Sequence, residues 1–247
     1  ITNINQYLDL VNEIKKNNGS TSLNFRQKDI KNGGEGAPLS PIFHQILALQ
    51  NKIKLPLCIL NIGGISNITI IKNFNDNFEN LKSRDIGPGN CLIDTWVRKN
   101  SNKNYDKDGI LASRGIMNEI ILEQAQELFS NRNKKKKNTY DVSDFDVSFA
   151  RGLSLEDGTA TLTQFTGSII GEALDSILRK ENGKEWKILL CGGGRKNKIL
   201  INIIKKNCSK NYIIESIDNY FIDGDFVESQ AFAFLAIRSI LNLPISF

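Results

Sequence analysis

One short turn, Asp85-Ile86-Gly87-Pro88-Gly89-Asn90, most constrains the fold of this chain. Two apolar stretches precede it, residues 57–61 and 65–71, with the glycine pair Gly63-Gly64 between them. This pattern predicts a strand, a tight turn and a second strand. Apolar residues at helical spacing follow Asn90, which predicts a helix of about three turns. A carboxylate at a strand end, followed by glycines and a helix start, is typical of ligand sites in open α/β sheets.

The composition of this turn suits phosphate chemistry. Gly87 and Gly89 would let backbone N–H groups approach an anion closely, and the helix start would add unpaired N–H groups and a favourable dipole. Asp85 fits such a place if it takes a proton or holds a metal near the phosphate. The alternative is a simple glycine turn in which Asp85 only caps or turns the chain, and short glycine motifs alone do not separate the two.

Composition narrows the protein class. The chain has 247 residues, of which 40% are hydrophobic, and a mean hydropathy of −0.27, which indicates a globular protein with a real core. No apolar run is long enough to span a membrane, and no signal peptide is visible. The cysteines Cys58, Cys91, Cys191 and Cys208 form no CxxC pair, which predicts reduced, buried thiols in a cytoplasmic protein. The only histidine, His44, rules out a multi-histidine metal site and is expected to form local hydrogen bonds near a helix start.

The net charge of +5 comes largely from a run of four lysines at residues 134–137. No aromatic residues are interleaved with these lysines, so the run indicates a solvated loop rather than a nucleic-acid site. We therefore expect neither a nucleic acid nor a membrane as a partner.

The rest of the chain predicts alternating helices and strands. A long irregular loop at 26–39 leads to a helix at 41–49, and a further helix is expected at about 113–129 with Ile121, Ala125 and Leu128 on its inner face. A helix opens at 153–158, a strand is expected at 212–217, a turn at 223–225 and a closing helix at 228–241.

A second glycine site follows the clearest strand of the chain, residues 187–191. That strand ends in Gly192-Gly193-Gly194 and leads to a helix near 197–204, so backbone there could lie flat against a ligand. Neither glycine site is a Walker A or a GxGxxG motif. A nucleotide site made of glycine turns on hairpins and strand ends suggests, by fold-level analogy, the superfamily of sugar kinases, actin and heat-shock ATPases.

Six motifs resemble those of the anhydro-N-acetylmuramic acid kinase family, in that family's order and over nearly the whole chain. They are Asn61-Ile62-Gly63-Gly64-Ile65-Ser66-Asn67-Ile68-Thr69, Asp85-Ile86-Gly87-Pro88-Gly89-Asn90, residues 25–39, Tyr105-Asp106-Lys107-Asp108-Gly109, Cys191-Gly192-Gly193-Gly194 with Asn197, and Asp223-Gly224-Asp225 with Glu228. The resemblance implies an α/β, actin-like ATPase (ribonuclease H-like) fold of two lobes with the nucleotide in the cleft. Residues 1–56 would be the remnant of an incomplete N-terminal lobe with a sugar-side loop, and residues 57–247 the C-terminal ATPase-type lobe.

The resemblance also implies a reaction. Enzymes of this family transfer the γ-phosphoryl group of ATP to the primary hydroxyl of 1,6-anhydro-N-acetylmuramic acid, while water opens the anhydro bridge. The product is N-acetylmuramic acid 6-phosphate, in peptidoglycan recycling and amino-sugar catabolism. The implied cofactors are ATP and Mg²⁺, the magnesium ligands stay open, and a cytoplasmic homodimer with a small-molecule sugar substrate is expected.

The resemblance assigns roles to individual residues. Asp85 matches the catalytic aspartate that activates the attacking water as general base. Residues expected at the nucleotide are Gly63, Gly64, Gly87, Gly192, Gly193, Gly194 and Asn197. Residues expected at the sugar are Glu35, Gly36, Asn90 and Glu228.

The chain departs from the family pattern in three ways. Ile86 stands where the family usually has Thr, which removes a hydroxyl beside Asp85, and Glu35 stands where Gln is commoner. The family's glycine- and Ser/Thr-rich N-terminal phosphate loop is absent, so we expect the chain to be truncated and weak or inactive alone. The alternatives are a non-catalytic sugar or nucleotide sensor, which would not need Asp85, and a phosphatase of the same superfamily.

Overall fold

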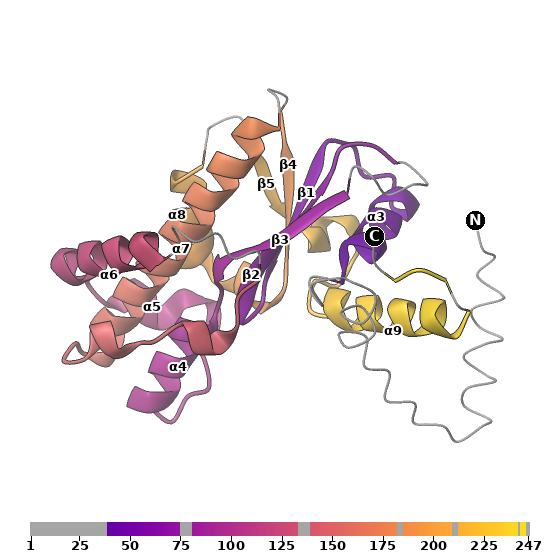
Figure 1. Ribbon diagram of the computed structural model, residues 1–247. Coiled ribbons are helices and arrows are strands. Elements are labelled where there is room, and N and C mark those ends of the chain that lie inside the picture. Colours follow the sequence, from indigo (N-terminus) through magenta and orange to yellow (C-terminus); the bar gives the residue numbers. More distant parts are fainter. Residues whose placement is uncertain are drawn as a thin grey trace, which may run out of the picture.

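The computed structural model describes residues 39–74, 81–132, 139–181, 185–208, 212–241 and 243–245. Within these residues a five-stranded sheet, with strand order β3-β2-β1-β4-β5, stands between two groups of helices (Figure 1). The strands are β1 (Leu57–Ile62), β2 (Ile65–Ile71), β3 (Leu81–Pro88), β4 (Lys187–Cys191) and β5 (Ile213–Ser216).

The sheet is mixed, and its topology places three strand ends together. Strands β1, β2 and β3 pair antiparallel as a meander, whereas β1 pairs parallel with β4 and β4 parallel with β5. Because β3 and β1 both run opposite to β2, the carboxyl ends of β3, β1 and β4 lie at one edge of the sheet. This arrangement confirms the predicted α/β, ribonuclease H-like lobe.

Helices cover both faces of the sheet (Figure 1). Helices α7 and α8 pack on one face, and α3 and α9 lie on the other, while α4, α5 and α6 pack on α7 away from the sheet. The helices are α3 (Pro41–Gln50), α4 (Cys91–Asn100), α5 (Ile110–Arg114), α6 (Glu119–Arg132), α7 (Leu155–Lys180), α8 (Lys198–Lys206) and α9 (Val227–Ile240). Across the described ranges, no helix combines the length and the apolarity that crossing a bilayer requires.

The side chains of β1 alternate between two hydrophobic cores. Leu60 and Ile62 join the core beneath α7 and α8, whereas Leu57 and Ile59 join the core beneath α3. A strand covered on both faces needs apolar residues at successive positions. This requirement explains why residues 57–60 read as one continuous apolar run.

The sequence prediction fails at residues 113–129, where one helix was expected and two are present. Helix α5 ends at Arg114, and α6 begins at Glu119. Side chains of α7 bind the segment between the two helices. Asp157 accepts a hydrogen bond from the Ile116 amide (2.8 Å), and Thr161 accepts one from the Asn118 amide (3.0 Å).

The break also shifts the inner face of the second helix. Leu122 and Ala125 are buried in the helical core of α4, α6 and α7, but Leu128 is 58% exposed. The expectation that Leu128 lies on the inner face is therefore wrong.

Parts of the sequence interpretation lie outside the described residues. These are Glu35, Gly36 and the rest of the loop up to residue 38, and the lysine run at 134–137. The proposed division at residue 56 stays a prediction. Within the described chain, α3 packs on the sheet through Leu47 and Ala48.

His44 is buried inside α3 and bonds across the fold, not locally as expected. Its Nδ1 shares a hydrogen bond of 2.8 Å with Oγ1 of Thr69 on β2, and the side chain is 2% exposed. Burial lowers the pKa of His44 from 6.5 to about 4. The neutral imidazole therefore belongs to the folded state.

This burial predicts a loss of stability in mild acid. Between pH 6.5 and 4 the unfolded chain binds a proton at His44 that the folded chain does not, so stability falls as the pH falls. We expect this group to lower the free energy of unfolding by about 2 kcal/mol between pH 7.5 and pH 5. Urea denaturation of wild type and His44→Gln at both pH values measures it. An equal drop in both proteins would contradict the assignment.

Candidate active site

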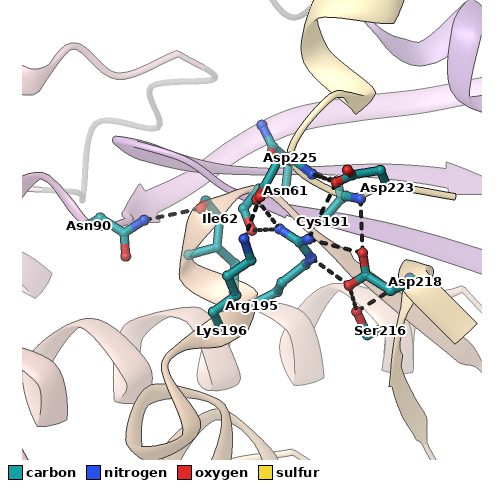
Figure 2. A network of polar contacts seen from close by, with 12 residues as sticks. Asn61, Ile62, Asn90, Cys191, Arg195, Lys196, Ser216, Asp218, Asp223 and Asp225 are labelled. Atoms are coloured by element: carbon teal, nitrogen blue, oxygen red, sulfur yellow. Dashed lines mark hydrogen bonds and ion pairs between the residues drawn. The ribbon is translucent and has the colours of Figure 1, made fainter. Parts of the chain in front are cut away.

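Two glycine turns meet at the sheet edge where β1 and β4 end. Asn61 pairs with Cys191 in the parallel register, so the Gly63-Gly64 turn and the turn at residues 192–194 are neighbours. Asn90 lies between them. Its Nδ2 donates to the carbonyl oxygen of Ile62 (3.2 Å), as Figure 2 shows. The structure thus brings together glycines that are about 130 residues apart in the sequence.

Asp85 lies on β3 at the same edge. Its side chain is buried, at 7% exposed, and its Oδ2 accepts a hydrogen bond from the Tyr140 amide (2.8 Å). The β2–β3 register shifts between Ser66 and Asn67, and the Ser66 hydroxyl donates to the Pro88 carbonyl (2.9 Å) beside this irregularity. Bulges next to functional sites redirect side chains. This one leaves Asp85 directly opposite Asn67.

The side chain of Ile86, one of the departures from the family pattern, lies in the hydrophobic core. Ile86 is 5% exposed and packs in the core beneath α7 and α8, on the face of the sheet opposite to Asp85. A hydroxyl at position 86 would therefore lie in this core, and its effect on Asp85 stays a prediction.

Three backbone amides where β3 joins α4 are not open to an anion. The Gly89 and Cys91 amides donate to the Gly64 carbonyl (2.9 and 3.2 Å), and the Asn90 amide donates to the Gly63 carbonyl (2.7 Å). The tip of the β1–β2 hairpin therefore caps this helix. A phosphate at this edge would have to bind other backbone amides.

Packing explains several of the predicted nucleotide glycines without a ligand. A Cβ on Gly87 would lie 2.7 Å from the Ile169 side chain of α7. A Cβ on Gly194 would lie 2.3 Å from the Ile62 side chain, and one on Gly192, whose φ is 77°, would lie 2.7 Å from the Ile62 carbonyl oxygen. These three positions have no room for a larger residue.

Three other glycines have no such explanation. Against the described residues, a Cβ on Gly63, Gly64 or Gly193 would make only ordinary contacts, the nearest at 3.6, 3.7 and 3.8 Å, and none of the three has positive φ. The fold itself therefore accepts a side chain at each of them. Glycine at such positions lets the backbone lie close against a ligand.

Arg195 fixes the second glycine turn, and the sequence interpretation missed it. Its side chain is 4% exposed, its Nε and Nη2 donate to the two oxygens of Asp218 (2.7 and 2.9 Å), and its Nη1 donates to the Gly192 carbonyl (3.0 Å) (Figure 2). Nη1 also donates to Asp225, and the Gly192 amide donates to the Gly224 carbonyl (3.0 Å). The predicted turn at 223–225 is thus joined to the glycine turn.

The only sequence signal for this network was an arginine directly after three glycines, with acidic residues downstream. The Arg195 guanidinium holds the pKa of Asp218 well below its usual value. The pair therefore stabilises the fold above a pH of about 4, and this contribution is lost as the pH falls further.

Arg195→Lys is expected to loosen the glycine turn. Lysine cannot make the two-pronged contact with Asp218 while also reaching the Gly192 carbonyl, so we expect the free energy of unfolding to fall by about 2 kcal/mol. Urea denaturation measures it. Lys196→Met is the matched control, because Lys196 is 52% exposed and its bond to Asp225 is a surface ion pair worth at most about 1 kcal/mol. Equal losses in both variants would contradict the special role of Arg195.

Two further predicted site residues, Asn197 and Glu228, differ in how far they are buried. Asn197 is 6% exposed and caps α8, since its Oδ1 accepts from the Leu200 amide (3.0 Å). Glu228 is exposed in the first turn of α9. Burial raises the pKa of the Cys191 thiol to about 12, and the charge of Glu228 adds to this effect.

Among the described residues, no group of three or more His, Cys, Asp or Glu side chains comes together as a metal site. All four cysteines are free thiols. Asp85 is a buried carboxylate at this edge, and the Tyr140 amide donates to it.

The sequence of this chain is similar to those of known proteins. A family model described as anhydro-N-acetylmuramic acid kinase matches residues 9–247. Similar proteins with that name come from Pelagibacter ubique (50% identical, 95% of this chain and 61% of the relative) and Zymomonas mobilis (38% identical, 90% and 58%). A third comes from Aliivibrio fischeri (35% identical, 91% and 60%).

The chain spans about three fifths of the length of these curated relatives. A solved activator of 2-hydroxyisocaproyl-CoA dehydratase from Clostridium difficile, with bound ADPNP, is similar with a TM-score of 0.42 and 13% identity, over 77% of this chain and 64% of that one. A likeness that distant says nothing about the site. The family match and the six motifs agree, and the chain belongs to the anhydro-N-acetylmuramic acid kinase family.

Proposed function

We propose that this chain carries the general base and part of the nucleotide site of an anhydro-N-acetylmuramic acid kinase. The observation that carries the proposal is the position of Asp85, buried at the edge where two glycine turns meet, in a chain of this family. The whole enzyme would convert ATP, water and 1,6-anhydro-N-acetylmuramic acid into ADP and N-acetylmuramic acid 6-phosphate.

In the proposed reaction, the Asp85 carboxylate takes a proton from a water molecule. The water oxygen bonds to the anomeric carbon, and the bond from that carbon to the bridging oxygen breaks. The bridging oxygen, which becomes the O6 oxygen, bonds to the γ-phosphorus, and ADP leaves. The buried edge holds the base and the phosphates at fixed positions, which lets one site serve both steps.

The open glycines are the proposed phosphate and nucleotide contacts. Gly63, Gly64 and Gly193 have room in front of their backbone, whereas Gly87, Gly192, Gly194 and Asn197 shape the turns. Asn90 lies at the glycine turns, so we move its proposed contact from the sugar to the nucleotide side. Glu228 remains a proposed sugar contact.

Magnesium would neutralise charge on the phosphates of ATP. The described residues do not form a complete site for it, so we assign it no protein ligand. Magnesium in phosphate sites commonly keeps several waters and the substrate's own oxygens as ligands.

A cytoplasmic location, which the free cysteines support, and a homodimer belong to the same proposal.

An isotope experiment tests this function. The protein is incubated with ATP, magnesium and the anhydro sugar in ¹⁸O-water, and the products are analysed by mass spectrometry. We expect sugar phosphate with ¹⁸O in the sugar and none in the phosphate. The experiment uses this chain and the product of its entire open reading frame, which also tests the expected weakness of the chain alone.

Each other outcome identifies an alternative. Inorganic phosphate with ¹⁸O and no sugar phosphate would indicate a phosphatase. Sugar or nucleotide binding without turnover in either protein would indicate a sensor, and both results would overturn the kinase.

A further inference from the structure

A row of polar side chains crosses the sheet next to Asp85. The register places Asp85 of β3 opposite Asn67 of β2, Asn67 opposite Asn61 of β1, and Asn61 beside Cys191 of β4. Residues paired across neighbouring strands point to the same face. The row therefore extends from the proposed base to the second glycine turn, on the face that carries α3 and α9.

Two opposed asparagines are an unusual choice for the inner strands of a sheet, because Asn is disfavoured in strands. Both are half-buried. Other polar residues of β2 have structural partners, since Ser66 donates to the Pro88 carbonyl and Thr69 bonds to His44. The carboxamide of Asn67, in contrast, has no hydrogen-bond partner within the described part of the chain.

Asn61 joins this row to the glycine turns. Its Oδ1 is 3.7 Å from the Cys191 sulfur and would lie 2.4 Å from a Cβ on Gly192, while its Nδ2 would lie 3.8 Å from a Cβ on Gly63. Figure 2 shows Asn61 between Cys191 and Ile62, beside the Arg195 network. The row of amides thus lies between the proposed base and the proposed phosphate contacts.

We propose that Asn67 is a further substrate-contacting residue, which holds the attacking water together with Asp85. Side chains directly opposite in an antiparallel pair have Cβ atoms about 5 Å apart, which leaves room for a water between a carboxylate and a carboxamide. Asp85 takes one proton of this water, and Asn67 Oδ1 accepts a hydrogen bond from the other hydrogen, which stays on the oxygen. A lone pair of the water then points at the anomeric carbon. This inference rests on the proposed function.

Asn67→Ala tests the inference in the product of the entire open reading frame. We expect kcat for sugar phosphate to fall on the order of 10²-fold, because the water loses one of the two groups that orient it. The KM for ATP should stay unchanged, because the glycine turns are untouched. Ser83→Ala is the matched control, since Ser83 lies on the same face of β3, one pair further from the edge. It should keep wild-type kcat.

Asn67→Asp tests independently whether this side chain faces the proposed base. A second carboxylate opposite Asp85 raises the pKa of the base, so the acidic limb of the pH–rate profile should move up by about one unit. If the alanine variant does not fold, Asn67→Thr, a better strand residue, repeats the kcat measurement.

The outcomes separate the two proposals. A wild-type protein that forms no sugar phosphate overturns the proposed function and this inference with it. An active wild type with full activity in folded Asn67→Ala, or with an unmoved acidic limb in Asn67→Asp, overturns the role of Asn67 alone.

Discussion

Asp85→Asn is expected to lower the rate of sugar phosphate formation by about 10³-fold while leaving the protein folded. The amide has the size of the carboxylate but cannot take a proton from water. Its oxygen can still accept the hydrogen bond that the Tyr140 amide donates to Asp85. The rate is measured from ¹⁸O-labelled sugar phosphate, and ATP binding is measured by calorimetry.

Asp175→Asn is the control for this prediction. Asp175 pairs with Arg179 one turn later on α7, on the other side of the sheet from the proposed water. The control should keep wild-type activity and ATP affinity. A folded Asp85→Asn protein with more than a tenth of the wild-type rate would remove Asp85 from the role of general base.

Gly89→Ala is expected to lower the free energy of unfolding by about 3 kcal/mol. A Cβ at this position would lie 2.3 Å from the Gly63 carbonyl oxygen and 3.1 Å from that of Gly64. Both neighbours are backbone atoms that cannot move without opening the hairpin tip. Urea denaturation measures the loss.

Gly64→Ala is the matched variant, because among the described residues its Cβ would meet only the Val142 side chain, at 3.7 Å. We expect stability within about 0.5 kcal/mol of wild type, and an affinity for ATP reduced about tenfold because the methyl group takes the place of a phosphate oxygen. If Gly64→Ala binds ATP normally, the open glycines are not phosphate contacts. If Gly89→Ala is as stable as Gly64→Ala, the inferred clash between a side chain at position 89 and the hairpin tip is wrong.

Local patterns in the sequence were sufficient for these strands and for the glycine turn at the end of each, and the structure adds that the two turns meet. The strand at 187–191 and the hairpin at 57–71 are buried apolar runs with glycine punctuation, and parallel strands must end at a common edge. The split between α5 and α6 was missed because Asp157 and Thr161, some 40 residues downstream, supply part of its hydrogen bonding. Gly115 and the Asn118 cap were the available local signals, since Asn118 accepts from the Ile121 amide.

Local patterns were also insufficient to predict which residues of the site face one another. The motif at 61–69 contains Asn61 and Asn67, but only the strand register shows that they face each other and that Asn67 faces Asp85. The role of Arg195 depends on Asp218, 23 residues further on, which no spacing rule connects to a glycine turn. Contacts between distant segments decide these positions, and a single sequence does not state them.

Three hydrogen bonds from Gly89, Asn90 and Cys91 to the hairpin tip limit how this edge can move. The tip separates from α4 only when the three break together, which costs about 3 kcal/mol at roughly 1 kcal/mol each. Such an opening is populated about 1% of the time or less, and the three amides should exchange with solvent as one slow unit. In the proposed enzyme, the spacing between the hairpin tip and the start of α4 would therefore be held, and substrates would enter through movements elsewhere.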